Sequence, residues 1–110
     1  MYENDKNHLI LISEAIAKIE SYTKGFNNSI NFVKDTKSFD ATLMNFIVIA
    51  ECAGRLSEYF KNEHSEIEWK KVNAFRNLIA HDYFGIDEEE VWDIVTFHMP
   101  KLKEKILQVL

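Results

Sequence analysis

Four polar side chains of different chemistry stand within one octapeptide: the cation of Arg76, the amide of Asn77, the imidazole of His81 and the phenol of Tyr83. The surrounding periodicity predicts a helix, and an ideal α-helix turns about 100° per residue. With Arg76 placed at 0°, Tyr83 falls about 20° before it, and Asn77 and His81 fall at about 100° and 140°. We therefore expect the four groups to share one wedge of the helix surface.

This wedge has the groups needed to act on a phosphodiester. The apolar neighbours Phe75, Leu78 and Ile79 fall on the opposite side of the helix, which gives the segment a core face and a chemical face. Arg76 and His81 are separated by about 7.5 Å of axial rise, which the long arginine side chain can span. A guanidinium that binds a phosphate beside an imidazole near its working pKa is what metal-independent phosphodiester cleavage requires.

Each of these residues also has a plain structural interpretation. An isolated Arg76 would most often be a surface residue paired with a carboxylate. His81 could favour the negative end of a helix dipole, and Tyr83 could be an aromatic residue at the rim of the core. It is their order and their joint placement on one wedge that favour the functional interpretation.

The octapeptide resembles the motif of HEPN-domain proteins, and more narrowly that of the HepT-like toxins of HEPN/MNT toxin–antitoxin pairs. The resemblance continues through IAECAGRLSEYFKNEHSEIEWKKVNAFRNLIAHDYFGIDEEEVWDIVTFHMPKLKEKI and includes LISEAIAKIESYTKGF near the N-terminus. Trp69 and Trp92 flank the motif as in the family. One departure is Ala50-Glu51-Cys52, where the family usually carries Gly-Glu-Ala. Glu51 is kept, so the departure affects only the closeness of local packing.

The resemblance implies a homodimer in which two motifs face one another across a cleft, and RNA cleavage that needs no metal or other cofactor. His81 would move the proton of the ribose 2′-hydroxyl or of the leaving oxygen, and Arg76 would stabilise charge on the phosphoryl oxygens. Asn77 would orient the imidazole or the phosphate. Tyr83 resembles the tyrosine to which a nucleotidyltransferase (MNT-domain) antitoxin transfers AMP.

Two other classes of function remain open. The same wedge could hold a phosphate without breaking a bond, as in a noncatalytic subunit that binds nucleotide or presents substrate to a minimal nucleotidyltransferase. A purely structural helical bundle is the third interpretation, and it leaves the polar wedge unexplained.

Composition and charge restrict the class of protein and the compartment to be expected. The 110 residues are 46% hydrophobic and 28% charged, with 3 Gly and 1 Pro, which is typical of a single folded, helix-rich domain over residues 1–110. One cysteine, no apolar run long enough for a bilayer and no visible signal peptide favour a cytoplasmic protein without a membrane partner. The net charge of −5 disfavours a general nucleic-acid binder, although Lys70, Lys71 and Arg76 could form a local cationic site.

The apolar periodicity predicts an all-α, up-and-down four-helix bundle without repeats or strands. The expected helices span about 5–22, 41–62, 68 to 81 or 83, and a last one after Asp87, the expected N-cap of a capping box with Glu90. Residues 26–40 are expected to connect the first two, with a short helix at 30–33. Pro100 should kink the last helix or start its second segment.

The second expected helix is apolar on two sides. One side carries Leu43, Phe46, Ile47, Ala50 and Ala53, and the other carries Val48, Ile49, Cys52, Leu56 and Tyr59. A helix that is apolar nearly all round must be covered all round, and in so short a chain this predicts a partner helix from a second subunit.

Glu51 stands out in this helix because a carboxylate in apolar surroundings needs a partner. Arg76 and Arg55 are the candidates, which makes Glu51 a supporting residue of the motif. Cys52 has the character of a small hydrophobe, and His98, near the core stripe, that of a packed or capping residue. No metal site is predicted, since no convincing ligand spacing occurs.

Overall fold

The computed structural model describes residues 3–78 and 83–110, apart from the side chain of Tyr83. The described residues are helical or lie in short connections, and they contain no strand, so the all-α prediction is confirmed. The elements in chain order are α1 (Glu3–Thr23), α2 (Ser29–Lys34), α3 (Thr36–Gly54), α4 (Glu58–Glu63), α5 (Trp69–Ala74), η1 (Phe75–Leu78), η2 (Tyr83–Gly85), α6 (Glu88–Asp93), η3 (Ile94–His98) and α7 (Met99–Val109).

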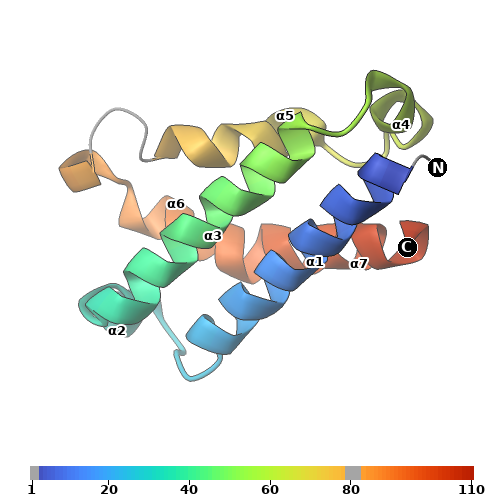
Figure 1. The fold of residues 1–110 in the computed structure, drawn as a ribbon. Coiled ribbons are helices and arrows are strands. Elements are labelled where there is room, and N and C mark those ends of the chain that lie inside the picture. The colour runs from blue at the N-terminus through green and yellow to red at the C-terminus, as the bar shows by residue number, and fades with distance from the viewer. Residues whose placement is uncertain (1–2, 79–82) are drawn as a thin grey trace.

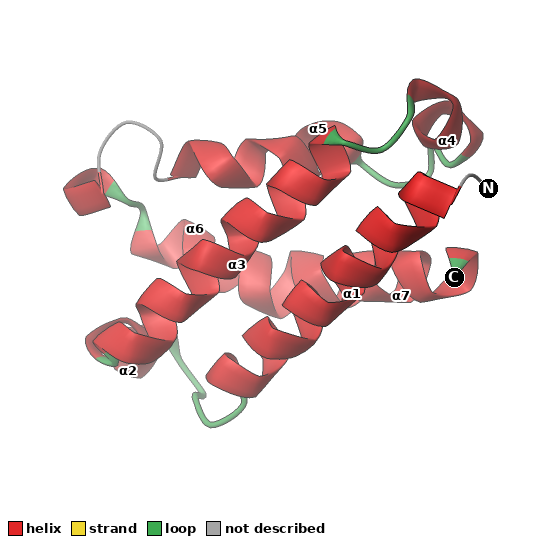
Figure 2. Cartoon of the chain, viewed as in Figure 1, coloured by secondary structure: helices red, strands yellow, loops and turns green. Residues whose placement is uncertain are grey.

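Four helical rods build the bundle (Figures 1 and 2): α1, α3, the α5–η1 segment and the path through α6, η3 and α7. The long helices α1 and α3 lie side by side and pack most extensively, with α5 and η1 against α3 and with α7 against α1. Phe46, Ile12 and Ile106 are fully buried members of a single apolar cluster that draws on every rod. This arrangement matches the predicted four-helix bundle.

The second rod is shorter than predicted. We expected one helix over about 41–62, but α3 begins at Thr36 and ends at Gly54, and α4 starts anew at Glu58. Ser57 sets the restart, because its Oγ accepts a hydrogen bond from the Phe60 backbone N–H at 3.1 Å, as an N-cap does. The carboxylate of Asp5, 3% exposed, accepts bonds from both the N–H and the Oγ of Ser57, at 2.8 and 2.7 Å. The break is therefore built by side chains of α1 and α4.

The third rod changes its helical type inside the motif. The prediction of one α-helix from about Glu68 through the motif is wrong in this respect, since α5 ends at Ala74 and Phe75–Leu78 form a 3₁₀ turn. A 3₁₀ turn advances about 120° per residue rather than 100°, so the wedge angles drawn for an ideal α-helix do not hold here. His81 lies outside the described residues, and so does the side chain of Tyr83.

The last rod follows its sequence signals closely. The Asp87 side chain accepts a hydrogen bond from the Glu90 N–H at 3.1 Å, which confirms the predicted N-cap. Between α6 and α7 the backbone widens into a π-helical turn at Ile94–His98, where the Met99 N–H reaches the Ile94 carbonyl. Pro100 stands in the first turn of α7, where its missing N–H costs no helical bond.

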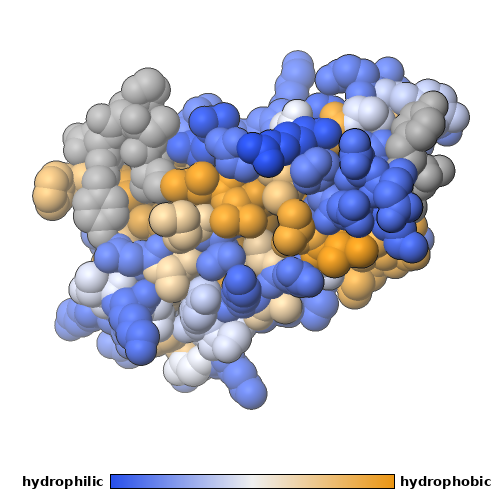
Figure 3. Space-filling model, in the orientation of Figure 1, coloured by the Kyte–Doolittle hydropathy of each residue, from blue (hydrophilic) through white to orange (hydrophobic). Residues whose placement is uncertain are grey.

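The second apolar side of α3 corrects the argument for a dimer. Of this side, Ile49, Cys52 and Leu56 are 0%, 8% and 3% exposed within the single chain, so they need no partner helix, whereas Tyr59 is 63% exposed. They are covered because the bundle wraps more of α3 than two neighbouring helices would. Apolar surface does remain across α3 and α1 (Figure 3), where Met44 and Leu11 are 59% and 45% exposed. A dimer therefore stays a prediction, and this exposed surface is its basis.

Candidate functional site

The centre of the candidate site is an ion pair between η1 and α3. The Arg76 Nη2 atom lies 3.1 Å from the Glu51 Oε1 atom, and the two side chains are 58% and 42% exposed. Of the two arginines considered for Glu51, the structure pairs it with Arg76. An ion pair this exposed contributes about 1 kcal/mol or less to folding. Its main effect is positional, because it holds the guanidinium beside α3 while leaving more than half of the side chain open to a ligand.

The 3₁₀ turn explains why Arg76 faces outward. Residues three apart are eclipsed in a 3₁₀ helix, so Phe75 and Leu78 share one side and leave Arg76 and Asn77 on others. Phe75 is 6% exposed, and its ring centroid lies 5.4 Å from that of Phe46 on α3. This aromatic contact anchors η1 to the core, and Arg76 and Asn77 are exposed as a consequence.

The structure thus brings together two of the predicted residues, Arg76 and Glu51, and places Asn77 next to Arg76 on the exposed η1 turn. His81, the predicted catalytic residue, lies outside the described residues, and so does the side chain of Tyr83, the predicted AMP acceptor. Over residues 3–78 and 83–110, no group of three or more His, Cys, Asp or Glu is placed to hold a metal ion. Within the same ranges no helix is long and apolar enough to cross a membrane.

Cys52 lies one residue from Glu51 but faces the core. Burial raises the pKa of its thiol, an effect that the nearby Arg55 cation opposes and Glu51 reinforces. A raised pKa keeps the thiol protonated and therefore a poor nucleophile at neutral pH. The predicted role of Cys52 as a small hydrophobe is consistent with its 8% exposure.

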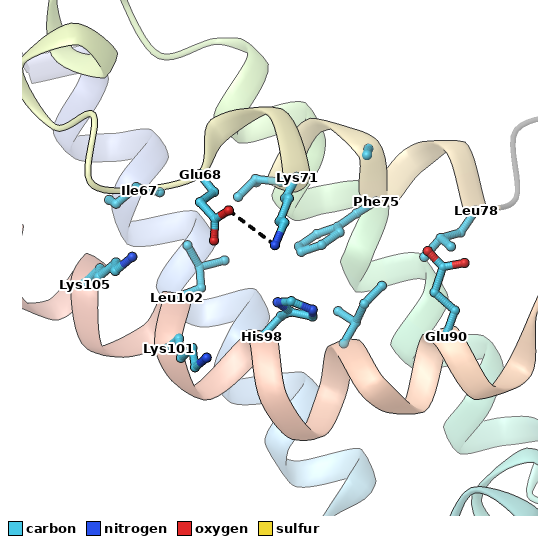
Figure 4. Close-up of a pocket in the computed structure, with 13 residues that line it drawn as sticks. Ile67, Glu68, Lys71, Phe75, Leu78, Glu90, His98, Lys101, Leu102 and Lys105 are labelled. Carbon is cyan, nitrogen blue, oxygen red and sulfur yellow. Dashed lines mark ion pairs between the residues drawn. The ribbon is translucent and has the colours of Figure 1, made fainter.

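Sequence reasoning missed Lys101 and Lys105 of α7, which lie on the other side of η1. Together with Lys71 of α5, which the sequence already offered as part of a cationic site, they surround a groove into which the half-buried His98 also projects (Figure 4). The sequence predicts only a packing or capping role for His98. The spacing of Lys101 and Lys105, four residues apart on one helical face, was the available signal.

Comparison with known proteins places the chain in a family. The family model described as "Ribonuclease HepT-like" matches residues 12–109. A Thermococcus cleftensis protein named "Probable ribonuclease HepT" is 32% identical over 96% of this chain and 94% of its own length. A Caldanaerobacter subterraneus protein named "Putative RNase" is 28% identical over 73% of this chain and 71% of its own.

A Methanocaldococcus jannaschii protein named "Gamma-glutamylcyclotransferase and putative RNase" is 33% identical over the whole of this chain, which spans 49% of that relative's length. No solved structure matches the chain significantly. The family match begins within α1 and covers the other three helical rods, including Glu51 and the motif from Arg76 to Tyr83. The chain belongs to the HepT-like ribonuclease family.

Proposed function

We propose that this chain is a metal-independent endoribonuclease that acts as the toxin of a toxin–antitoxin pair. The observation that carries the proposal is the Arg76–Glu51 pair, in which a guanidinium is positioned at 3.1 Å by a carboxylate and still 58% exposed. The exposed part of the guanidinium is the part that a phosphate can reach. A phosphate-binding arginine needs this exposure, since its planar fork of N–H donors must reach two phosphoryl oxygens.

In the proposed reaction the 2′-oxygen of a ribose attacks the adjacent phosphorus and the bond to the 5′-oxygen breaks. His81 takes the proton of the 2′-hydroxyl or returns one to the leaving oxygen, so the products carry a 2′,3′-cyclic phosphate and a 5′-hydroxyl. Arg76 stabilises the charge that develops on the phosphoryl oxygens. Asn77, next to Arg76 on the exposed η1 turn, orients the imidazole or the phosphate.

Neutralisation by a partner is the second part of the proposal. A cognate nucleotidyltransferase transfers AMP from ATP to Tyr83: the phenolic oxygen bonds to the α-phosphorus, pyrophosphate leaves and the phenolic proton goes to solvent. The attached nucleotide brings its own phosphate to Arg76 and occupies the place of the substrate. This step rests on the resemblance of the motif to the family, as does the role of His81.

RNA cleavage by the purified chain in the presence of EDTA tests the proposal, with His81→Ala alongside. General acid–base catalysis contributes about a hundredfold or more, so the variant should be at least that much slower. Cleavage that requires added magnesium, or product ends with a 3′-hydroxyl, would contradict the proposed chemistry. A parent protein that binds nucleotide but cuts no RNA would favour the noncatalytic subunit of a nucleotidyltransferase.

A further inference from the structure

A groove separates the third and fourth rods of the bundle. Its cavity of about 220 Å³ lies between α5–η1 on one side and α6–η3–α7 on the other (Figure 4). The apolar part of its lining comes from both sides: Ile67, Val72, Ala74, Phe75, Leu78, Ile94 and Leu102. Other rods pack directly, α1 on α3 and α3 on α5. The groove is thus an open seam whose floor is the edge of the hydrophobic core.

The groove lies where two irregular turns face one another. Phe75 and Leu78 reach it from the 3₁₀ turn η1, and Ile94 and His98 reach it from the π-helical turn η3. A 3₁₀ turn is narrower than an α-helix and a π turn is wider, so the two walls do not mesh by the regular packing of ridges into grooves. The space that remains between the two walls follows from the backbone geometry of these turns.

The rim of the groove is cationic although the chain is acidic. Three lysines line it, Lys71, Lys101 and Lys105, against the two carboxylates of Glu68 and Glu90, while the whole chain carries −5. Lys71 is paired with Glu68 at 3.2 Å, and the Lys105 Nζ donates to the Glu66 carbonyl at 2.8 Å. No ion pair or hydrogen bond to a described residue engages the Lys101 ammonium. A local positive charge on an acidic protein selects for an anion.

We propose that this groove is the RNA-docking subsite of the chain, which takes one unpaired base on its apolar floor and the adjoining phosphates on Lys71, Lys101 and Lys105. The inference rests on the proposed ribonuclease function. The cavity is below the roughly 300–1,000 Å³ usual for drug-sized ligands, which suits a single base ring better than a larger molecule. Apolar and aromatic side chains beneath a cationic rim are the combination that binds single-stranded nucleic acid.

The shared η1 turn connects this subsite to the catalytic arginine. Phe75 and Leu78 form part of the groove wall, and Arg76 and Asn77 stand between them in the chain on other sides of the same turn. An RNA strand that continues from the groove around the η1 turn would reach Arg76. The subsite also gives an RNA substrate a local excess of cations, three lysines against two carboxylates, on a chain whose net charge is −5.

Binding of a non-cleavable RNA tests this assignment on the full chain. The probe is a fluorescein-labelled, 2′-O-methylated oligoribonucleotide of about eight nucleotides, followed by fluorescence anisotropy over a series of salt concentrations. Lys101→Glu reverses the charge on the groove rim, and Lys18→Glu makes the same change on the exposed side of α1 as the matched control. We expect Lys101→Glu to weaken binding about tenfold or more and to reduce the salt slope by about 0.7, and Lys18→Glu to change affinity by less than about twofold.

A second measurement does not depend on a variant. The imidazole resonances of His98, half-buried at the groove, should shift on addition of the same oligonucleotide, whereas those of His8 on α1 should not. Equal affinities of Lys101→Glu and Lys18→Glu, or an unshifted His98 at saturating RNA, would overturn the subsite.

The cleavage assay separates this result from the proposed function. If the parent cleaves RNA and Lys101→Glu both cleaves and binds it equally well, the ribonuclease stands and the groove assignment fails. If the parent binds the probe through Lys101 and His98 but never cleaves RNA, the groove stands and the ribonuclease proposal fails.

Discussion

The guanidinium of Arg76 and the carboxylate of Glu51 meet at 3.1 Å, which joins the motif turn to the C-terminal part of α3. Glu51→Gln removes the charge but keeps the shape. Because both side chains are partly exposed, stability should change by less than about 1 kcal/mol. RNA cleavage should fall roughly ten- to a hundredfold, because the arginine loses its fixed position. Urea unfolding and a cleavage assay measure the two effects. Glu58→Gln, which breaks the surface pair with Lys61, is the control and should leave cleavage unchanged.

Asp5 ties the first helix to the start of α4 from a buried position. Its carboxylate, 3% exposed, accepts two hydrogen bonds from Ser57. Asp5→Ala leaves both donors without this partner and should reduce the free energy of unfolding by about 2–3 kcal/mol. Asp87→Ala removes an exposed N-cap and should cost about 1 kcal/mol. Chemical denaturation measures the free energy of unfolding of both variants. An equal loss in the two would show that the buried Asp5–Ser57 hydrogen bonds stabilise the fold no more than an exposed N-cap does.

Cys52 gives the fold a stability that depends on pH. Burial raises the pKa of its thiol, with Arg55 opposing and Glu51 assisting. The unfolded chain therefore releases this proton first, near the ordinary cysteine pKa of about 8.5, and stability should fall as pH rises beyond that value. Cys52→Ala should lose less stability than the parent between neutral pH and about pH 10. The urea unfolding midpoints of both proteins at the two pH values test this prediction. An identical loss of stability in the parent and in Cys52→Ala would mean that other groups cause the decrease at high pH.

We expect a dimer at micromolar concentration. Since most of the second side of α3 is buried within the chain, the expectation now depends on the exposed apolar side chains around Met44 and Leu11. Light scattering should give twice the 12.9 kDa of the monomer. Met44→Glu should shift the population toward monomer without unfolding it. A monomeric parent over the whole range would remove both the dimer and the cleft shared between two motifs.

Tyr83 is the predicted acceptor of AMP. Phenylalanine keeps the ring and removes the nucleophilic oxygen, so Tyr83→Phe should stay folded and escape neutralisation by the cognate nucleotidyltransferase with ATP. Intact-mass spectrometry after incubation with that enzyme gives the readout. An AMP adduct on Tyr83→Phe equal to that on the parent would place the acceptor elsewhere in the chain.

Sequence reasoning located the rods of the bundle but not the changes within them. The periodicity of Leu9, Ile12, Ile16 and Ile19 predicted α1 almost to its ends, and Asp87 predicted the start of α6. Such signals are local, so a single chain displays them. The break between α3 and α4 depends on the hydrogen bond from Ser57 to Asp5, which is far away in sequence. The spacing of hydrophobic residues does not predict such a contact. Covering of Ile49 and Leu56 likewise depends on how the rods assemble.

The candidate site was also predictable only in part, because some of its features depend on local sequence and others on tertiary packing. Arg76 and its partner Glu51 could be proposed, since an unpaired carboxylate in an apolar helix demands a cation. The 3₁₀ turn that carries Arg76 could not be predicted from the sequence. It depends on the packing of Phe75 against Phe46, which competes with the α-helical propensity of the segment. The groove also escaped notice, because it depends on two irregular turns meeting across the bundle.

The π turn at Ile94–His98 makes the face of α7 tolerant of a change in chain length. A π turn accommodates one residue more than an α-helix of the same span. Deletion of Thr96, an exposed residue of this turn, would therefore let a regular α-helix form over the same span and leave the residues after it close to their present places. The same deletion in a regular α-helix would rotate everything after it by about 100°. Lys101 and Lys105 would thus keep their place on the groove, and Leu102 and Ile106 theirs in the core. One codon can be lost at this turn without moving the surface that the lysines serve.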